Sequence, residues 1–343
     1  MKPVLRILEP GMAASLQDGG RLGLQRYGVP VSGALDAVSL ALANILAGNP
    51  PGTAAIEILG AGFAFEIEAE SVTLALAGMA GGFTLRSGGG DIRVPALRSA
   101  NARRGDIVRI PPPKGGAVSY LAVEGGFDVA PVLGSRSTYR RAALGGYRGS
   151  TFQAGDGLPL CLASSSRAAV RIKADIRAPD VLRAMRGPNA AYFSPGAFEM
   201  LFASAYTVAP ASDRMGLRLQ GPALERAMEG ELAAQGTTAG ALQVPADGHP
   251  ILLLADRQTA GGYPRIATVI GADIAAAGRL AAGMSVRFEE VDREEAVRLL
   301  REQRAWLAAL PAALEPAGSD ALTPEHLLSS NLIGGVTAGA AEE

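Results

Sequence analysis

Short apolar or alternating segments separated by glycines fill residues 55–129, and this pattern constrains the fold more than any other feature of the chain. Alternation of apolar and polar residues over short runs is typical of half-buried strands. The 44 glycines suit such a fold, because barrels and sandwiches need bends, bulges and tight turns. The pattern therefore favours a barrel or a sandwich, with candidate strands at residues 56–58, 63–67, 72–76, 83–85, 106–110 and 120–123.

A second series of this kind covers residues 181–291 and echoes the first. Residues 104–110 and residues 282–288 each combine a glycine turn with an alternating strand. A chain of 343 residues is long enough for two domains. We predict a mainly β protein with two β-rich halves and a few short helices. The expected units are an N-terminal half (1–165) with a polar glycine loop and one helix, a C-terminal half (180–292), and a C-terminal helix and tail (293–343).

Two helices are indicated by spacing and end signals. Apolar residues recur at helical spacing from Leu35 to Leu46, with Ser32 as a possible N-cap and Gly48 within the stop signal. Near the C-terminus, Asp292 and Glu295 form an acidic variant of a capping box ahead of a second periodic run. We expect this second helix to pack on the β structure.

The composition excludes several classes of function. The formal net charge is -1 and the positive residues are scattered, so nucleic acid is not an expected partner. No apolar run approaches the ~20 residues that span a bilayer. The N-terminus lacks the long apolar core of a signal peptide. We therefore expect a cytoplasmic protein without a membrane partner.

Rare residues limit the chemistry further. Cys161 is the only cysteine and His249 and His326 are the only histidines, so no zinc motif can be written and no metal site is expected. Cys161 stands between two leucines and is interpreted as a small core residue. No lysine lies in a phosphate-binding loop or between two methionines. The chain should carry no covalently bound biotin. If ATP is used, the conventional lysine cradle for it should lie elsewhere or in a partner.

A polar cluster follows a buried strand in the second half. Residues 251–255 form an unbroken apolar run, and four hydrogen-bonding side chains come directly after it, from Asp256 to Thr259. A rigid strand that ends in polar groups and glycines suits a binding or catalytic site. The alternative is a polar turn with an exposed Asp256–Arg257 pair.

The loop at residues 15–36 is long, polar and rich in glycine. Asp18 and Arg21 either form a structural pair across a glycine turn or contribute to a ligand site. Tyr27 lies beside Arg26 and close to Val29, Pro30 and Val31 in the same loop, a combination that suits a protein–protein hot spot. The alternative is that these apolar side chains cover the helix that follows.

Four separated motifs carry a family resemblance. They are SLQDGGRLGLQRYGVPVSGALD from residue 15, SRSTYRRAALGGYRG from 135, SDRMGLRL from 212 and GALQVPADGHPILLLADRQTAGGYPRIATVIGADI from 240. Together, and in this order over nearly the whole chain, they resemble the biotin-dependent carboxyltransferase family. This family includes the C subunit of 5-oxoprolinase, the antagonist of the sporulation-kinase inhibitor, allophanate hydrolase subunit 2-like proteins and the carboxyltransferase domain of urea amidolyase.

The resemblance implies a cyclophilin-like β-barrel architecture and a partnership with a smaller related barrel protein, the B subunit. The first implied function is that of the C subunit in an ATP-dependent 5-oxoprolinase, which together with the A and B subunits converts 5-oxoproline to glutamate. A second is transfer of a carboxyl group to urea or a related amide from carboxybiotin, with the biotin on a separate carrier. A third is a regulatory binding protein that sequesters a kinase inhibitor.

Residues in the matching motifs are the candidate site. A site rich in Gln, Asp, Arg and Tyr suits the planar edges of an amide or ureido substrate. The candidate catalytic residues would hold a carboxylate or oxyanion, orient an arginine or accept an amide proton: Asp256, Arg257, Gln258 and Arg214. A structural Asp213–Arg214 pair is the alternative for the third motif. The candidate substrate-binding residues are Gln243, Thr259, Tyr263, Asp18 and Arg21.

Overall fold

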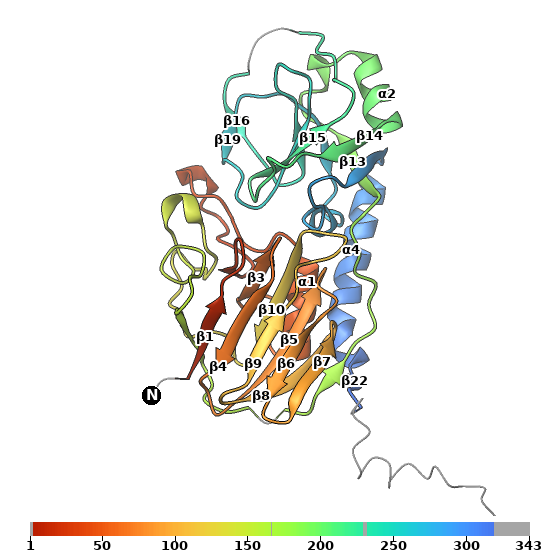
Figure 1. Cartoon of the computed structure of the whole chain (residues 1–343). Helices are drawn as coiled ribbons and strands as arrows, with labels where there is room; N and C mark the ends of the chain where they lie inside the picture. The colour runs from red at the N-terminus through yellow and green to blue at the C-terminus, as the bar shows by residue number, and fades with distance from the viewer. Residues whose placement is uncertain (1–2, 166, 229–231, 319–343) are drawn as a thin grey trace, which may run out of the picture.

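The computed structural model describes residues 3–165, 167–228 and 232–318. The predicted tail beyond residue 318 lies outside this part of the chain. The first half contains two antiparallel sheets that face each other (Figure 1). One has six strands in the order β11 (Gly157–Pro159), β1 (Val4–Glu9), β4 (Phe63–Ile67), β9 (Ile107–Ile110), β6 (Gly82–Ser87) and β7 (Gly90–Pro95). The other has seven, in the order β2 (Ser15–Gln17), β3 (Ala55–Leu59), β10 (Val118–Val123), β5 (Ser71–Gly78), β8 (Arg98–Arg103), β12 (Val170–Arg171) and β22 (Glu315–Pro316).

The two sheets enclose the main core of this half, so the first series of strands forms a sandwich. Leu5, Phe65 and Val108 of the six-stranded sheet belong to one buried cluster with Leu74 and Leu121 of the seven-stranded sheet. On its other face, the seven-stranded sheet packs against helix α1 (Ala37–Ala47) through a second buried cluster. The first half therefore has three layers, sheet, sheet and helix.

The second half is a closed barrel. Its strands run β13 (Val181–Arg186), β20 (Arg265–Val269), β17 (Ala241–Gln243), β18 (Ile251–Leu253), β15 (Gly216–Gln220), β14 (Ala205–Val208) and β21 (Ser285–Glu290). Pairing of β13 with β21 in parallel closes the ring. A small ribbon of β16 (Gln235–Gly236) and β19 (Ala260–Gly261) lies beside it. The predicted mainly β fold with a barrel is confirmed.

Helix α1 forms where the sequence predicts, but its cap differs. Asp36, not Ser32, is the N-cap, and its carboxylate accepts hydrogen bonds from the N–H groups of Val38 and Ser39. Ser32 has a positive φ of 55° and lies before the helix begins. Gly48 ends the helix in the left-handed conformation, as the stop signal predicts.

Helix α4 (Arg293–Ala309) runs along both halves (Figure 1). Its N-cap is Asp292, which accepts from the N–H of Glu295 at 2.8 Å as the capping box predicts. Gln303 donates to the carbonyl of Ala272 at 2.7 Å on the barrel side. Leu310, just beyond the helix, is buried in the α1 cluster of the first half. The C-terminal segment thus fastens the barrel to the sandwich.

The remaining helical segments are short: η1 (Gln25–Tyr27), η2 (Arg140–Ala142), η3 (Ala190–Tyr192), α2 (Pro195–Ala203), α3 (Ile274–Ala277) and η4 (Leu310–Ala313). Among the described residues, no helix is both long and apolar enough to cross a membrane. The prediction that Cys161 is a core residue is wrong. Its position follows β11 at the edge of the six-stranded sheet, and the residue is exposed.

Candidate functional site

Arg214 lies at the junction of the two halves and contacts both. It precedes strand β15, and its guanidinium donates to both carboxylate oxygens of Asp256 at 2.9 and 3.1 Å. From the first half it reaches the carboxylate of Glu57 on β3 and the carbonyl of Gly33, the latter at 2.6 Å. Burial alone would lower the pKa of Arg214, but Glu57 and Asp256 outweigh burial and raise it. Arg214 is therefore a buried cation held by two carboxylates.

Glu57 makes further hydrogen bonds within the first half. Its second carboxylate oxygen accepts from the hydroxyl of Tyr120 at 2.6 Å and from the N–H of Leu35 at 3.0 Å. The Tyr120 hydroxyl accepts in turn from the N–H of Asp36 at 2.9 Å. Burial first, and then the neighbouring Glu57, raise the pKa of Tyr120 well above 10.0. Asp36 pairs with Arg279 of the barrel half at 2.6 Å, so two buried ion pairs join the halves.

A cavity of about 190 Å³ opens beside Arg214 between the halves. Gln17 of β2 lines it and is only 1% exposed. The Gln17 amide nitrogen donates to Ser15 at 3.0 Å and to the Thr138 carbonyl at 3.1 Å, whereas its oxygen has no partner among the described residues. That oxygen is itself buried, so Gln17 keeps one unused acceptor next to the cavity. The lining residues are Met12, Ala13, Ser15, Gln17, Leu59, Thr138, Arg140, Arg141, Thr151, Ser212, Asp213, Arg214, Met215 and Asp256.

A second cavity of about 300 Å³ adjoins the first and collects three predicted residues. Gln243, Gln258 and Tyr263 all line it. Gln258 donates to the amide oxygen of Gln243 at 3.1 Å, and the Gln243 nitrogen has no partner among the described residues. Arg141 and Asp213 border both cavities and form an ion pair at 3.5 Å across the two halves. The two cavities thus share a wall made by that pair.

Asp18 and Arg21 line neither cavity. Asp18 accepts from the hydroxyls of Ser135 and Ser137, each at 2.6 Å. Arg21 donates to the carbonyls of Val132 and Ser137. No direct Asp18–Arg21 ion pair occurs in the described part of the chain. The two residues instead fix the first motif against the loop at 130–149, which carries the second motif.

Gly145 in the loop at 130–149 allows the Arg21 side chain to pack closely against that loop. Its φ is +68°, and a Cβ added there would lie 1.9 Å from an Arg21 nitrogen and 2.3 Å from the Ser137 carbonyl oxygen. Only glycine accepts both this backbone conformation and this close approach without strain. The loop that carries Arg140 and Arg141 is therefore positioned by Arg21.

Arg257 and Thr259 line neither cavity. Arg257 is buried, and one guanidinium nitrogen donates to the carbonyl of Leu254 at 3.3 Å. Burial lowers its pKa, because no carboxylate pairs with it among the described residues. The carbonyl of Thr259 accepts from the N–H of Thr237 at 2.9 Å. The alternative of an exposed Asp256–Arg257 pair is wrong, since both residues are buried and Asp256 pairs with Arg214.

Sequence reasoning missed several residues of the site. Gln17 and Arg140 lie inside motifs that carry the resemblance, so those motifs could have pointed to them. Glu57 had a different signal, a single acid between two isoleucines in a predicted strand. A charge in a fully buried strand requires a partner, and here the partner is Arg214. The alternative of an Asp213–Arg214 pair is wrong, because Arg214 pairs with Glu57 and Asp256 while Asp213 pairs with Arg141.

Within the described ranges, no group of three or more His, Cys, Asp or Glu side chains is placed to hold a metal ion. The polar side chains that line the two cavities carry guanidinium, amide, carboxylate and hydroxyl groups. These groups bind and orient planar ligands that carry carboxylate, carbonyl and N–H groups.

Comparisons with known proteins show which family the chain belongs to. A family model described as the carboxyltransferase domain, subdomains A and B, matches residues 27–290. The C subunit of the 5-oxoprolinase of Escherichia coli (strain K12) is 33% identical over 90% of this chain and 97% of that protein. The protein of the same name from Haemophilus influenzae is 35% identical over 89% of this chain and 96% of that protein.

A solved structure of a related protein has a similar fold. The crystal structure of the K. lactis urea amidolyase matches with a TM-score of 0.81 and 27% sequence identity. The match covers 92% of this chain but only 21% of that much longer protein. The chain therefore belongs to the carboxyltransferase-domain family.

Proposed function

We propose that this chain is the C subunit of an ATP-dependent 5-oxoprolinase and that, with the A and B subunits, it converts 5-oxoproline to glutamate. The proposal is supported by the two bacterial relatives of that name, which match over nearly their whole length. The single structural observation that carries it is the cavity between the halves, which arginine side chains line together with the amide of Gln17.

The polar groups of this cavity complement a cyclic amide that bears a carboxylate. Arg140 is exposed, its guanidinium has no partner among the described residues, and it supplies a cation for the carboxylate. Gln17 lines the same cavity, and its unpaired oxygen accepts the lactam N–H once that buried atom turns toward the ligand. Arg214 uses four of its five N–H groups on Glu57, Asp256 and Gly33, so one remains for the lactam carbonyl. Donors near the carbonyl oxygen would stabilise the charge that develops there during ring opening.

The chain supplies only part of such a reaction. Its sequence carries no phosphate-binding loop, so the conventional lysine cradle for the ATP that the complex uses lies elsewhere or in a partner subunit. No cofactor is bound covalently. The experiment is reconstitution, with glutamate release from 5-oxoproline measured for this chain alone and after addition of the A and B subunits and ATP. Turnover only in the mixture supports the proposal, whereas full turnover by the isolated chain contradicts it.

A second candidate is carboxyl transfer from carboxybiotin, on a separate carrier, to urea or a related amide. The observation that favours it is the pair of adjoining cavities, which would place two planar ureido groups on either side of Arg141 and Asp213. Incubation with a biotin carboxylase, its biotin carrier, bicarbonate, ATP and urea decides between the two. Carboxylated urea as product, with no glutamate from 5-oxoproline in the reconstituted mixture, would select the transferase.

A further inference from the structure

A row of side chains crosses the outer face of the six-stranded sheet, far from the cavities between the halves. Arg109 on β9 is the direct cross-strand partner of Ala64 on β4 and of Thr84 on β6. Thr84 is in turn the partner of Arg93 on β7. Residues directly opposite each other in a sheet place their side chains on the same face. Glu9 joins the row beside Ala64, because a bulge after Ile7 turns it away from the core.

This row forms one wall of a groove of about 630 Å³. Its floor includes Phe63 and Phe83, which are buried in the core of the sandwich. The other wall is the loop that carries Lys114, held in place because the Lys114 N–H donates to the Met79 carbonyl at 3.0 Å. A side chain added at Gly81 would meet nothing within 4 Å, so the groove is open there. The volume lies in the range of small-molecule sites.

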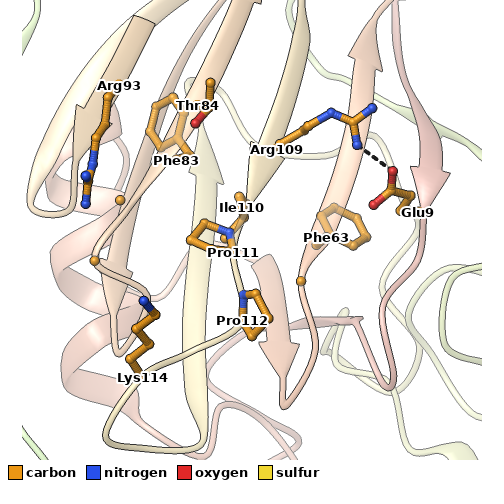
Figure 2. A pocket seen from close by; sticks show the side chains of 13 residues that line it. Glu9, Phe63, Phe83, Thr84, Arg93, Arg109, Ile110, Pro111, Pro112 and Lys114 are labelled. Atoms are coloured by element: carbon orange, nitrogen blue, oxygen red, sulfur yellow. Dashed lines mark hydrogen bonds and ion pairs between the residues drawn. The ribbon is translucent and has the colours of Figure 1, made fainter. Parts of the chain in front are cut away.

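The charges in the groove do not balance. Glu9 and Arg109 form an ion pair at the end of the groove near β1, as the dashed line in Figure 2 shows. At the other end lie Arg93 and Lys114, and neither side chain has a hydrogen-bond or ion-pair partner among the described residues (Figure 2). Three cations against one acid leave an excess of two positive charges, in a protein whose formal net charge is -1. A bound anion would offset this local excess.

We propose that this groove is a second binding site, and that it takes a small molecule with a doubly charged oxyanion, either a phosphate or a pair of carboxylates. Arg93 and Lys114 hold the anionic group, and the Thr84 hydroxyl donates a hydrogen bond to it. Charge-assisted hydrogen bonds of this kind are the strong ones. The exposed rings of Pro111 and Pro112 contact the less polar part of the ligand. None of these residues lines the cavities at Arg214, so this site is independent of the proposed function.

The test is calorimetric titration of the full chain with pyrophosphate and, separately, with citrate, at about 0.15 M salt, where long-range surface electrostatics are screened. We expect saturable binding of at least one probe to the wild type. The double variant Arg93→Ala/Lys114→Ala should bind it at least about tenfold more weakly, since two charge-assisted contacts are lost. Thr84→Val should weaken binding by a smaller factor. The probe that binds identifies the phosphate or the carboxylate class.

Arg104→Ala is the matched control, because Arg104 is exposed on the same half but lies outside the groove. The affinity of Arg104→Ala for the probe should stay within about twofold of that of the wild type, because salt screens an exposed charge that lies outside the groove. Arg93→Glu provides a second variant that reverses one charge. Absence of saturable binding to the wild type, unchanged affinity in the folded double variant, or an equal loss in Arg104→Ala would each overturn the proposal.

Discussion

Arg140 is the exposed cation of the candidate site that the structure leaves free to meet a substrate carboxylate. Replacing Arg140 by Ala should lower kcat/KM for 5-oxoproline in the reconstituted complex by about 10- to 100-fold, mainly through KM, because a charge-assisted contact to the bound substrate is lost. The melting temperature should change little, since exposed substitutions have small effects. Steady-state kinetics measure kcat/KM, and thermal unfolding measures the melting temperature.

The control for Arg140 lies in the same loop. Arg148 is also an exposed arginine, it lines neither cavity, and its guanidinium stacks over Tyr147 at 5.0 Å. Arg148→Ala should leave kcat/KM close to that of the wild type. An equal loss of activity in the two variants would show that general loop charge, rather than a substrate contact, is responsible.

The lowered pKa of Asp18 predicts how the stability of the protein depends on pH. Burial alone would raise its pKa, but hydrogen bonds from Ser135, Ser137 and the N–H of Arg136 outweigh burial and hold the pKa below its usual 3.8. The unfolded chain therefore binds more protons than the folded one between the folded pKa and 3.8, so stability rises with pH in that window. This contribution is fully present above pH 3.8 and is lost as the pH falls through the folded pKa.

Asp18→Asn removes this contribution. At pH 7 it should lower the free energy of unfolding by about 1 to 3 kcal/mol, because several donors lose a charged acceptor. The difference from the wild type should shrink as the pH is lowered below about 4. Urea denaturation at a series of pH values measures it. A difference that stays constant down to strongly acidic pH would show that the Asp18 carboxylate is not stabilised by these donors.

At the scale of elements, the sequence predicts strands well where side chains alternate and poorly where the backbone alone decides. Strands β3 and β4 coincide with predicted segments because apolar residues mark their buried faces. Strand β8 has the sequence RSANAR and was missed. It is a strand because its backbone pairs with β5 along six residues, and pairing with a distant strand is invisible to a local pattern.

The residues of the candidate site also divide into those that the sequence predicts and those that it misses. Arg214, Asp256, Gln243, Gln258 and Tyr263 were all found in motifs of the second half, and each lines one of the two cavities. The opposite wall comes from the first half and was missed, although Gln17 and Arg140 lie in motifs there, because no local pattern shows that these motifs face Arg214. Only the three-dimensional meeting of the halves brings that wall to Arg214.

The η1 loop carries a prediction about a partner. Tyr27 is 66% exposed and the Arg26 guanidinium stacks over its ring at 4.7 Å, so Tyr27 does not cover the helix that follows. Within the proposed complex, association with the B subunit should weaken by about 1 to 3 kcal/mol in Tyr27→Ala while the chain stays folded. Calorimetry of the two proteins measures the loss. Ile92→Ala, at an exposed apolar residue on β7, is the control, and the same loss in both variants would contradict an interface at Tyr27.

At the scale of the whole molecule, the two halves are joined through buried charge. Glu57 is fully buried, and removing it leaves Arg214 with one carboxylate instead of two and Tyr120 without its acceptor. Glu57→Ala should therefore lower the free energy of unfolding by about 3 to 5 kcal/mol, as expected when one member of a buried pair is removed. Because these contacts cross between the halves, we also expect the barrel and the sandwich of this variant to unfold in separate calorimetric transitions.

A matched pair on the surface makes this test specific. Arg6 and Glu68 form an ion pair at 2.9 Å, with side chains 38% and 36% exposed, inside the first half alone. Glu68→Ala should cost only about 0 to 1 kcal/mol, because solvent screens an exposed pair, and unfolding should keep the wild-type number of transitions. Urea and calorimetric unfolding of both variants compare the two sites. If Glu57→Ala were no more destabilising than Glu68→Ala, the junction would depend on helix α4 and the apolar contacts around Leu310 rather than on the charges at Arg214.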